Sequence, residues 1–404
     1  MSRTSQLPQE LIDKIVLELS GNWQSLEACS VVSSSFRDVS QKLLFKVLTI
    51  DLHIRFKAAN TRLCDAFTSN PRLGDHVRSL RVRTSNQMAT ADVLRMMPKL
   101  RSLEILGGGS FLTLICTRWP SIMDELKADI LSICFLPTLE QLKMKRISQF
   151  PLAVLRRCPQ LKDLQIPDNH LHDTSDRSSS MDILSSSVDH RVTDPPATRG
   201  YLESLTVFSP EVCQQILRTL RHPTSYLLLS RLRRHNGEIV HELSVTAFQA
   251  VLDFAAASLE IVHAVILPDR PPDNYLDLSR LRNLRKVRLS TPRKCLPQNM
   301  LWACHALESI PEVNSVETVF LTFAGPPCAA DSDVDPTLWG RIDELLTRER
   351  HSKTLRRVIV NTARYQNIEH PDDALLPAIA RGMPMLYSKG VVEDVPVLIN
   401  AAYA

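Results

Sequence analysis

A short apolar motif recurs along most of this sequence and limits the folds that the chain can adopt. The motif is an apolar residue, two variable residues, a second apolar residue, one variable residue and a third apolar residue. It occurs at Val77-Leu80-Val82, Leu100-Leu103-Ile105, Leu139-Leu142-Met144, Leu161-Leu164-Ile166, Leu202-Leu205-Val207, Val240-Leu243-Val245, Leu284-Val287-Leu289, Val316-Val319-Leu321 and Leu355-Val358-Val360. Residues two apart in a strand share a face, so the last two apolar positions point inward together. The motif therefore predicts a series of strands, each with one buried face.

Between these copies, apolar residues recur at the spacing of helices. We expect helices at residues 123–133, 210–220, 247–257 and 338–346, and an additional strand at residues 45–52 before the first copy. A unit of one strand and one helix cannot bury its apolar face alone, whereas stacked units share one continuous core. The pattern thus favours a mixed α+β or α/β solenoid.

One segment interrupts the array after its fourth copy. Residues 168–200 are rich in Ser, Asp, His, Thr and Pro and poor in large apolar residues. The segment is too long for an ordinary connection, so we expect a flexible surface insertion there. The array is expected to end near residues 383–392, where Pro384 and Gly390 break regular structure.

The first 51 residues have a different pattern. Apolar residues of the first predicted helix form one stripe, which comprises Leu11, Ile12, Ile15, Val16 and Leu19. Pro8 suits the first turn of a helix and Gly21 a helix end, so this helix should span residues 8–20. Two further short helices are expected at residues 26–32 and 36–44. A unit this small is marginally stable alone and should pack against something else.

These residues resemble an F-box, in the form that is abundant in fungal proteins. The resemblance rests on L-P-x-E-L-I at residues 7–12, the apolar Ile15, and C-S-V-V-S-S-S-F-R at residues 29–37. Phe36 stands where many F-boxes carry Trp and keeps an aromatic side chain there. The resemblance implies an F-box domain at residues 1–51 that binds the Skp adaptor of a Skp/cullin/F-box ubiquitin ligase. The residues implied in that contact and in the small core behind it are Leu7, Pro8, Leu11, Ile12, Ile15, Val32 and Phe36.

The rest of the chain, residues 52–404, resembles the leucine-rich repeats that often follow an F-box. Its intervals vary from about 20 to about 40 residues, whereas regular leucine-rich repeats hold to about 20–29. The asparagine that usually closes the repeat is absent from most copies. We therefore expect an irregular leucine-rich-repeat-like array of strands and helices.

Composition bears on the compartment and on the class of partner. The formal net charge is +4 over 404 residues, which is too small to argue for nucleic acid. The nine cysteines include no C-x-x-C pair and fit reduced thiols, which favours the cytoplasm or nucleus. The first residues are polar and do not predict a secretory signal. Charged residues interrupt the apolar run at residues 247–267, so we expect no membrane association.

Few residue patterns suggest chemistry. Gly107-Gly108-Gly109 follows a predicted strand, but no phosphate-binding Gly-Lys-Ser/Thr comes after it. His170 and His172 have no third metal ligand at a suitable spacing. Neighbours such as Cys304 and His305 point to different sides of a helix and cannot act as a nucleophile and its base. Serines at residues 178–187 could accept phosphate or form an unmodified linker. We expect no enzymatic activity, no metal and no cofactor.

Outward positions of the strand motifs are the remaining candidates for a binding site. The basic candidates for contact with a target are Arg81, Lys143, Arg285, Lys286, Arg288, Arg356 and Arg357. The acidic residues at such positions are Glu104, Asp163 and Glu317. The basic bias of the later strands favours an acidic or phosphorylated partner, with an ordinary solvated surface as the alternative.

The resemblance thus implies a non-catalytic subunit of a ubiquitin ligase that binds the Skp adaptor, and through it a cullin/RING ligase. The repeat array would hold a protein target. A scaffold that acts without ubiquitin transfer is the alternative. A helix-turn-helix at residues 23–44 that binds DNA is a third hypothesis, but basic residues are few on its last helix and Asp38 opposes them.

Overall fold

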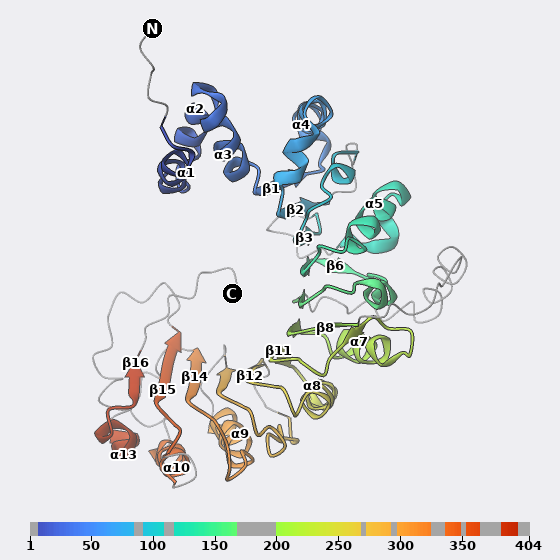
Figure 1. Ribbon diagram of the computed structural model, residues 1–404. Helices are drawn as coiled ribbons and strands as arrows, with labels where there is room; N and C mark the ends of the chain where they lie inside the picture. The colour runs from blue at the N-terminus through green and yellow to red at the C-terminus, as the bar shows by residue number, and fades with distance from the viewer. Residues whose placement is uncertain are drawn as a thin grey trace. The chain divides into compact units, whose positions relative to one another are not determined.

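A computed structural model describes residues 7–84, 92–108, 117–167, 199–267, 272–291, 297–324, 336–348, 353–363 and 381–394. The chain divides by its internal contacts into two compact units, Met1–Gly200 with His222–Leu227, and Tyr201–Arg221 with Leu228–Ala404. The division passes through two short strands, β8 (Gly200–Tyr201) and β10 (Leu227–Leu228). Most of the predicted insertion at residues 168–200 lies outside the described residues. The protein is mixed α/β, and each unit contains a parallel sheet (Figure 1).

Three short helices begin the first unit, as the apolar spacing predicts. They are α1 (Gln9–Glu18), α2 (Trp23–Val32) and α3 (Ser34–Leu44). The side chain of Asn22 accepts a hydrogen bond from the N–H of Ser25 and so caps α2. Ser33 accepts from the N–H of Phe36 and caps α3 in the same way. Pro8 directly precedes α1, so the sequence marks the start of each helix.

The sheet of the first unit has the strand order β1 (Val47–Asp51), β2 (Ser79–Arg83), β3 (Ser102–Leu106), β5 (Gln141–Lys145) and β7 (Asp163–Ile166). Its strands are parallel, and their register places Leu80, Leu103, Leu142 and Leu164 side by side. All four leucines are fully buried. The second apolar position of the motif therefore forms one continuous buried row across these strands.

Helices and short connecting segments link the strands of the first unit. The α-helices are α4 (Lys57–Ser69) and α5 (Asp124–Cys134), which lie on the same face of the sheet (Figure 1). The 3-10 helices are η1 (Ile54–Phe56), η2 (Pro71–His76), η3 (Asp92–Met96), η4 (Trp119–Ser121) and η5 (Leu152–Arg157). Two short strands, β4 (Thr117–Arg118) and β6 (Ile147–Ser148), pair with each other beside the main sheet. Several connections in this unit are thus only one or two helical turns long.

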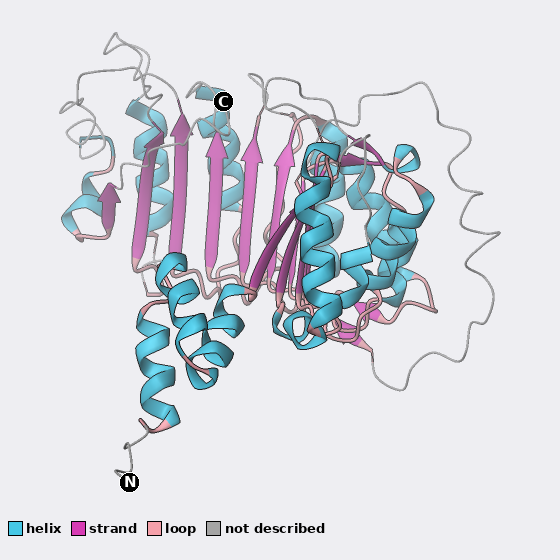
Figure 2. Cartoon of the chain, turned by 90° about the horizontal axis from the view of Figure 1, so that it is seen from above, coloured by secondary structure: helices cyan, strands magenta, loops and turns pink. Residues whose placement is uncertain are grey.

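The second unit repeats the same arrangement over a longer parallel sheet. Its strand order is β9 (Ser204–Val207), β11 (Arg234–Ile239), β12 (Ile261–Ile266), β13 (Lys286–Thr291), β14 (Thr318–Ala324), β15 (Arg357–Ala363) and β16 (Val392–Asp394). Its helices are α7 (Pro210–Arg221), α8 (Glu242–Phe254), α9 (Pro297–Glu308), α10 (Pro336–Thr347) and α13 (Pro384–Ser388). These helices lie on one face of the sheet, as Figure 2 shows for the long strands. In each unit, the face of the sheet opposite the helices is called the outward face.

One predicted strand is wrong. Val240 follows β11, while Leu243 and Val245 belong to α8. The strand in this region is β11. The motif positions are occupied by Leu232, which precedes the strand, and by His235 and Gly237 within it. His235 and Gly237 are both buried, so a histidine and a glycine replace the usual aliphatic pair.

The ring of Phe248 on α8 explains the glycine at position 237. A Cβ at Gly237 would lie 2.8 Å from two ring carbons of Phe248, so only glycine leaves room for that ring. The next strand, β12, is also absent from the predicted series. Its inward positions Val262 and Ala264 are fully buried and follow the buried Leu259 at the motif spacing.

The last described helix of the second unit is held by a buried carboxylate. Asp343 on α10 accepts hydrogen bonds from the N–H groups of Met385 at 2.9 Å and Leu386 at 2.8 Å. These two donors lie in the first turn of α13, where N–H groups have no partner within the helix.

None of the helices that the structure describes has the length and the apolar character that a membrane span requires.

Candidate functional site

The three-helix segment has a small core of its own. Ile12 and Val16 on α1 and Leu26 on α2 are buried together. Leu19, Phe36, Val39, Leu43 and Leu44 pack against them and are half-buried. Two of the predicted adaptor-contact residues, Ile12 and Phe36, therefore belong to the core or its edge.

The other five predicted adaptor-contact residues lie on the surface. On α1, Leu11 is 45% exposed and Ile15 is 46% exposed, and they are one helical turn apart. Leu7 and Pro8 are exposed directly before the helix, and Val32 is exposed at the end of α2. The helix α1 thus buries the stripe of Ile12 and Val16 and leaves the neighbouring stripe of Leu11 and Ile15 uncovered. We call Leu7, Pro8, Leu11 and Ile15 the apolar stripe.

Outward side chains of the first unit are largely paired with one another. Arg81 donates a hydrogen bond of 2.8 Å to Glu104, its partner in the register of β2 and β3. Lys145 on β5 reaches the same carboxylate at 3.2 Å, and Arg83 pairs with Asp51 at 3.2 Å. Burial acts to raise the pKa of Glu104, but hydrogen bonds from Arg81 and Lys145 lower it overall. Two carboxylates on this face, Glu104 and Asp51, are therefore paired with basic side chains.

Lys143 is the second predicted target-contact residue of this unit. It is half-buried on β5, beside Glu104 in the register. Burial, and then the charge of Lys145, lower the pKa of its amine. Asp163, predicted as an outward acid, accepts a hydrogen bond from the side chain of Gln165. Glu104 is already bound by Arg81 and Lys145, and Lys143 forms no ion pair of its own among the described residues.

The turn residues before the strands of the second unit alternate in charge. The row comprises Glu203, Arg233, Glu260, Arg285, Glu317 and Arg356. The N–H of each residue from Arg233 onward donates to the carbonyl of the residue before it in the row at 2.8–2.9 Å. Arg233 also pairs with Glu260 at 3.7 Å. Two predicted target-contact residues, Arg285 and Arg356, thus stand beside glutamates in what we call the alternating row.

Basic residues also occupy some of the next outward positions. One register row comprises Ser204, Arg234, Ile261, Lys286, Thr318 and Arg357. The following outward row contains His263 and Arg288 side by side. Lys286 and Arg357 are exposed, whereas Arg288 is half-buried. The sequence predicts Lys286, Arg288 and Arg357 as target contacts. It does not predict Arg234 and His263, because its strand motif falls on α8 and not on β11 and β12.

His263 and Ser290 are hydrogen-bonded on the outward face, with 3.2 Å between Nε2 and Oγ. A serine beside a histidine is the arrangement of a nucleophile and its base. Burial, and then the charge of Arg288, lower the pKa of His263 to about 3. A base with so low a pKa is a weak proton acceptor at neutral pH. The hydrogen bond has the geometry of such a pair, but the lowered pKa of His263 gives little support to catalysis by it.

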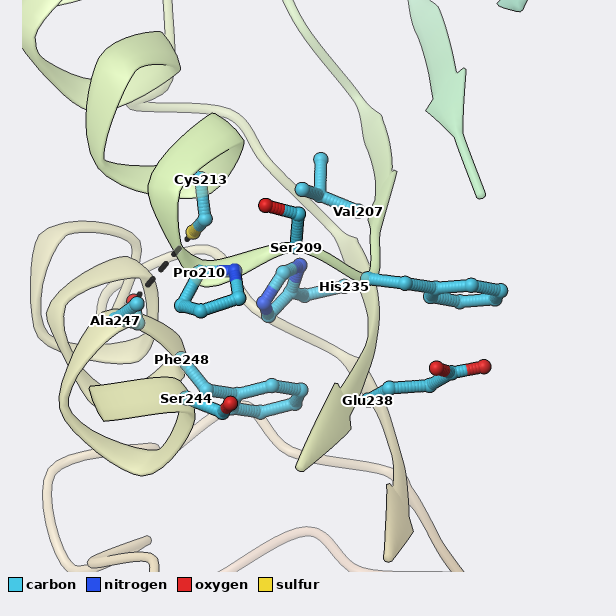
Figure 3. A pocket seen from close by; sticks show the side chains of 10 residues that line it. Val207, Ser209, Pro210, Cys213, His235, Glu238, Ser244, Ala247 and Phe248 are labelled. Carbon is cyan, nitrogen blue, oxygen red and sulfur yellow. Dashed lines mark hydrogen bonds between the residues drawn. The ribbon is translucent and has the colours of Figure 1, made fainter. Parts of the chain in front are cut away.

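A small cavity lies on the other side of β11, between this strand and the helices α7 and α8. Ser209, Cys213, His235 and Phe248 are among the residues that line it (Figure 3). Its volume of about 10 Å³ corresponds to one water molecule. His235 Nδ1 is 3.2 Å from the carbonyl oxygen of Leu205, while Nε2 has no partner among the described residues. The cavity suits a buried water better than a ligand.

The other candidates for chemistry have structural roles or lie outside the described residues. A Cβ at Gly107 would overlap the carbonyl oxygen of Arg146, which explains this glycine by close backbone approach. Cys304 is buried, and burial raises the pKa of its thiol to about 11. His305 pairs through Nδ1 with Glu308 at 3.2 Å and not with Cys304. His170, His172 and the serines at residues 178–187 lie outside the described residues.

Neither a metal site nor a known relative adds to these observations. No group of three or more metal-ligating side chains is found among the described residues. The sequence matches no protein-family model and no curated protein. Two surfaces bear on the function, the apolar stripe of α1 and the outward face of the second unit.

Proposed function

We propose that this chain is a non-enzymatic substrate-recognition subunit of a Skp/cullin/F-box ubiquitin ligase. The residues that resemble an F-box form three short helices, and the apolar stripe of the first helix is uncovered. Exposed apolar side chains next to a buried core are a common feature of protein interfaces. This stripe is the observation that carries the proposal. It would bind the Skp adaptor, while the strand-and-helix array, similar to leucine-rich repeats, would hold the target.

The mechanism is proximity. The adaptor connects this chain to a cullin/RING ligase, which brings the charged ubiquitin carrier. A target bound to the array is then held beside that carrier at a high effective concentration. In this mechanism the chain needs no cofactor and no catalytic side chain of its own.

A binding titration with purified Skp adaptor tests this proposal. Leu11→Ala combined with Ile15→Ala removes apolar contact area without touching the buried stripe of α1. Interface hot spots cost more than about 1 kcal/mol when truncated, so we expect the double variant to bind at least about tenfold more weakly. Leu7→Ala with Pro8→Ala, at the start of the same stripe, should act in the same direction.

Leu17→Ala is the matched control. Leu17 lies on the same helix and is 53% exposed, but it points away from the apolar stripe, so its truncation should leave adaptor affinity unchanged. A thermal melt followed by circular dichroism shows whether each variant keeps its fold. Equal affinity of the double variant and the wild type would contradict the proposal, as would wild-type binding weaker than about 10 µM, or about 7 kcal/mol.

The second candidate function is a scaffold that binds the adaptor without ubiquitin transfer. The same apolar stripe supports it, so the two functions differ only in the fate of the target after the adaptor has bound. Turnover of a bound target that is insensitive to loss of the cullin would favour the scaffold. DNA binding by α2 and α3 has less support, because Arg37 donates its Nε to the carbonyl of Ser30 at 3.1 Å.

A further inference from the structure

The outward side chains of β13 carry charge that the described part of the protein does not neutralise. Lys286, Arg288 and Ser290 alternate with the buried Val287 and Leu289, so all three point to the outward face. Arg288 is half-buried, and its Nε is fully buried without a hydrogen-bond partner. Among the described residues neither Lys286 nor Arg288 forms an ion pair. The strand thus presents two cations, Lys286 and Arg288, that have no counter-charge among the described residues.

Neighbouring strands do not supply that counter-charge either. The register places His263 and Phe320 on the two sides of Arg288. Ile261 and Thr318 flank Lys286, and Val265 and Thr322 flank Ser290 in the same way. His263 is hydrogen-bonded to Ser290 and is neutral near pH 7. No acid therefore stands next to Arg288 on the outward face of the described strands β12, β13 and β14.

An arginine in this position is costly for the free protein. Burial lowers the pKa of Arg288, which means that its environment disfavours the charge. A buried donor without a partner costs free energy that a bound acceptor would recover. In the first unit the comparable arginine, Arg81, has Glu104 as its partner at 2.8 Å. Arg288 therefore has no counterpart to Glu104 on the described strands beside it.

We propose that Arg288 and Lys286 form a binding subsite for an anionic group of the target protein, a phosphate or a carboxylate on an extended acidic segment. The planar guanidinium can offer two parallel N–H groups to either group, and Lys286 adds a second charge on the same face. Recognition of an acidic target rests on the proposed function. The subsite specifies the class of target that the subunit would bind. Anion binding itself does not depend on the adaptor.

The spacing of the cations also predicts the pattern of the ligand. Arg234 stands in the same register row as Lys286, two strands away, and has no described ion pair. Two strand spacings correspond to about 10 Å. A peptide in the extended polyproline II conformation rises about 3.1 Å per residue and returns its side chains to the same face every three residues. A segment that crosses the strands would therefore place acidic groups about three residues apart over Lys286 and Arg234.

Fluorescence anisotropy with synthetic peptides tests this proposal on the full chain without adaptor. The probes are one labelled serine-containing peptide, the same peptide with phosphoserines three residues apart, and the same peptide with glutamates at those positions. We expect the phosphorylated or the glutamate peptide to bind at least about tenfold more tightly than the serine peptide, with affinity that falls as salt rises. The comparison of the two anionic peptides identifies the source of the charge.

Two substitutions separate the subsite from general attraction of charge. Arg288→Gln should weaken binding of the anionic peptide by about tenfold or more, because a charge-assisted hydrogen bond is lost. Arg285→Gln makes the same charge change three residues earlier, in the alternating row beside Glu260 and Glu317. It should change the affinity by less than about twofold. Equal losses from both substitutions, or no preference for anionic peptides, would overturn the proposal.

A second measurement distinguishes loss of anion binding from loss of the fold. The charge of Arg288 helps to lower the pKa of His263, so an anion bound at Arg288 should raise it. The titration of the His263 imidazole can be followed by NMR with and without inorganic phosphate as the probe. An upward shift that is lost in Arg288→Gln supports the subsite. An unchanged His263 titration at saturating phosphate contradicts it. Failure of adaptor binding would leave both readouts unaffected.

Discussion

His235 and Phe248 lie with their ring centroids 4.4 Å apart in the interior of the second unit. His235 comes from β11 and Phe248 from α8, so the ring contact joins the strand to the helix that follows it. The neighbouring strands use aliphatic residues at the position of His235, Leu205 on β9 and Val262 on β12. This repeat therefore exchanges an aliphatic contact for an aromatic one that contains a titratable ring.

Stability should consequently fall in mild acid. Burial lowers the pKa of His235 from 6.5 to about 4. Between these values the unfolded chain binds more protons than the folded one, so the free energy of unfolding decreases as pH falls from about 6.5 to about 4. The contribution of His235 is up to about 3 kcal/mol. Urea unfolding at several pH values in this window measures it.

His235→Leu provides the comparison, since leucine stands at the equivalent position of β9. Its stability should depend less steeply on pH over the same window. His263, whose pKa burial lowers to about 3, has the same sign of effect and should keep part of the slope in the variant. Parallel curves for the variant and the wild type would show that His235 is not the group responsible.

The close approach of Gly237 and Phe248 predicts a strongly coupled pair. Gly237→Ala would place a Cβ 2.8 Å from the ring, and overpacking of this kind costs about 1–3 kcal/mol. A smaller residue in Phe248→Leu should relieve part of that cost. A double-mutant cycle in urea measures the coupling between the two positions. Simple addition of the two single effects would mean that the ring moves aside without cost.

Neighbouring residues of α1 should respond in opposite ways to truncation. Ile12 is 5% exposed in the small core, and removal of such a side chain costs about 2–5 kcal/mol. Leu11 is 45% exposed, so Leu11→Ala should change stability by no more than about 0.5 kcal/mol. Hydrogen exchange of the amides of α1 in each variant measures the difference. Similar destabilisation by both would show that the apolar stripe is covered in the folded chain.

The carboxylate of Asp343 should control the stability of the last helix. Asp343→Ala leaves the N–H groups of Met385 and Leu386 without their acceptor, at a cost of about 1–3 kcal/mol per buried group. We expect faster hydrogen exchange in α13 and in β16, and little change in β9 or β11. Asp343→Asn retains one side-chain acceptor and should have an intermediate effect. Exchange that is unchanged at α13 would argue that other contacts hold this helix.

The sequence predicts most strands because their apolar positions are also their buried positions. Leu103 and Ile105, for example, are fully buried on β3, where the motif places them. The motif fails at β11, where a histidine and a glycine fill the inward positions and apolarity is no guide. The motif wrongly predicts a strand at Val240-Leu243-Val245, because the first residues of α8 match its spacing. Only the three-dimensional position of Phe248 reveals why His235 and Gly237 fit.

The candidate binding residues are harder to predict than the fold. The helical stripe of α1 includes Leu11, Ile12, Ile15 and Val16 together, and the packing of α3 decides which of them remain exposed. Arg81 and Arg288 look alike in sequence, since both occupy outward motif positions. Their difference lies in the adjoining strands, because one has Glu104 beside it and the other has His263 and Phe320. Such neighbours depend on register across strands that are distant in sequence.

The alternating row of the second unit limits how this protein can change in length. Residues of opposite charge are neighbours at every step from Glu203 to Arg356, because successive repeats carry opposite signs at one position. Deletion or duplication of a single repeat would bring two like charges together, which is unfavourable for side chains on paired strands. Deletion or duplication of two adjacent repeats would keep the alternation intact. The array should therefore tolerate the gain or loss of an even number of repeats more readily than the gain or loss of an odd number.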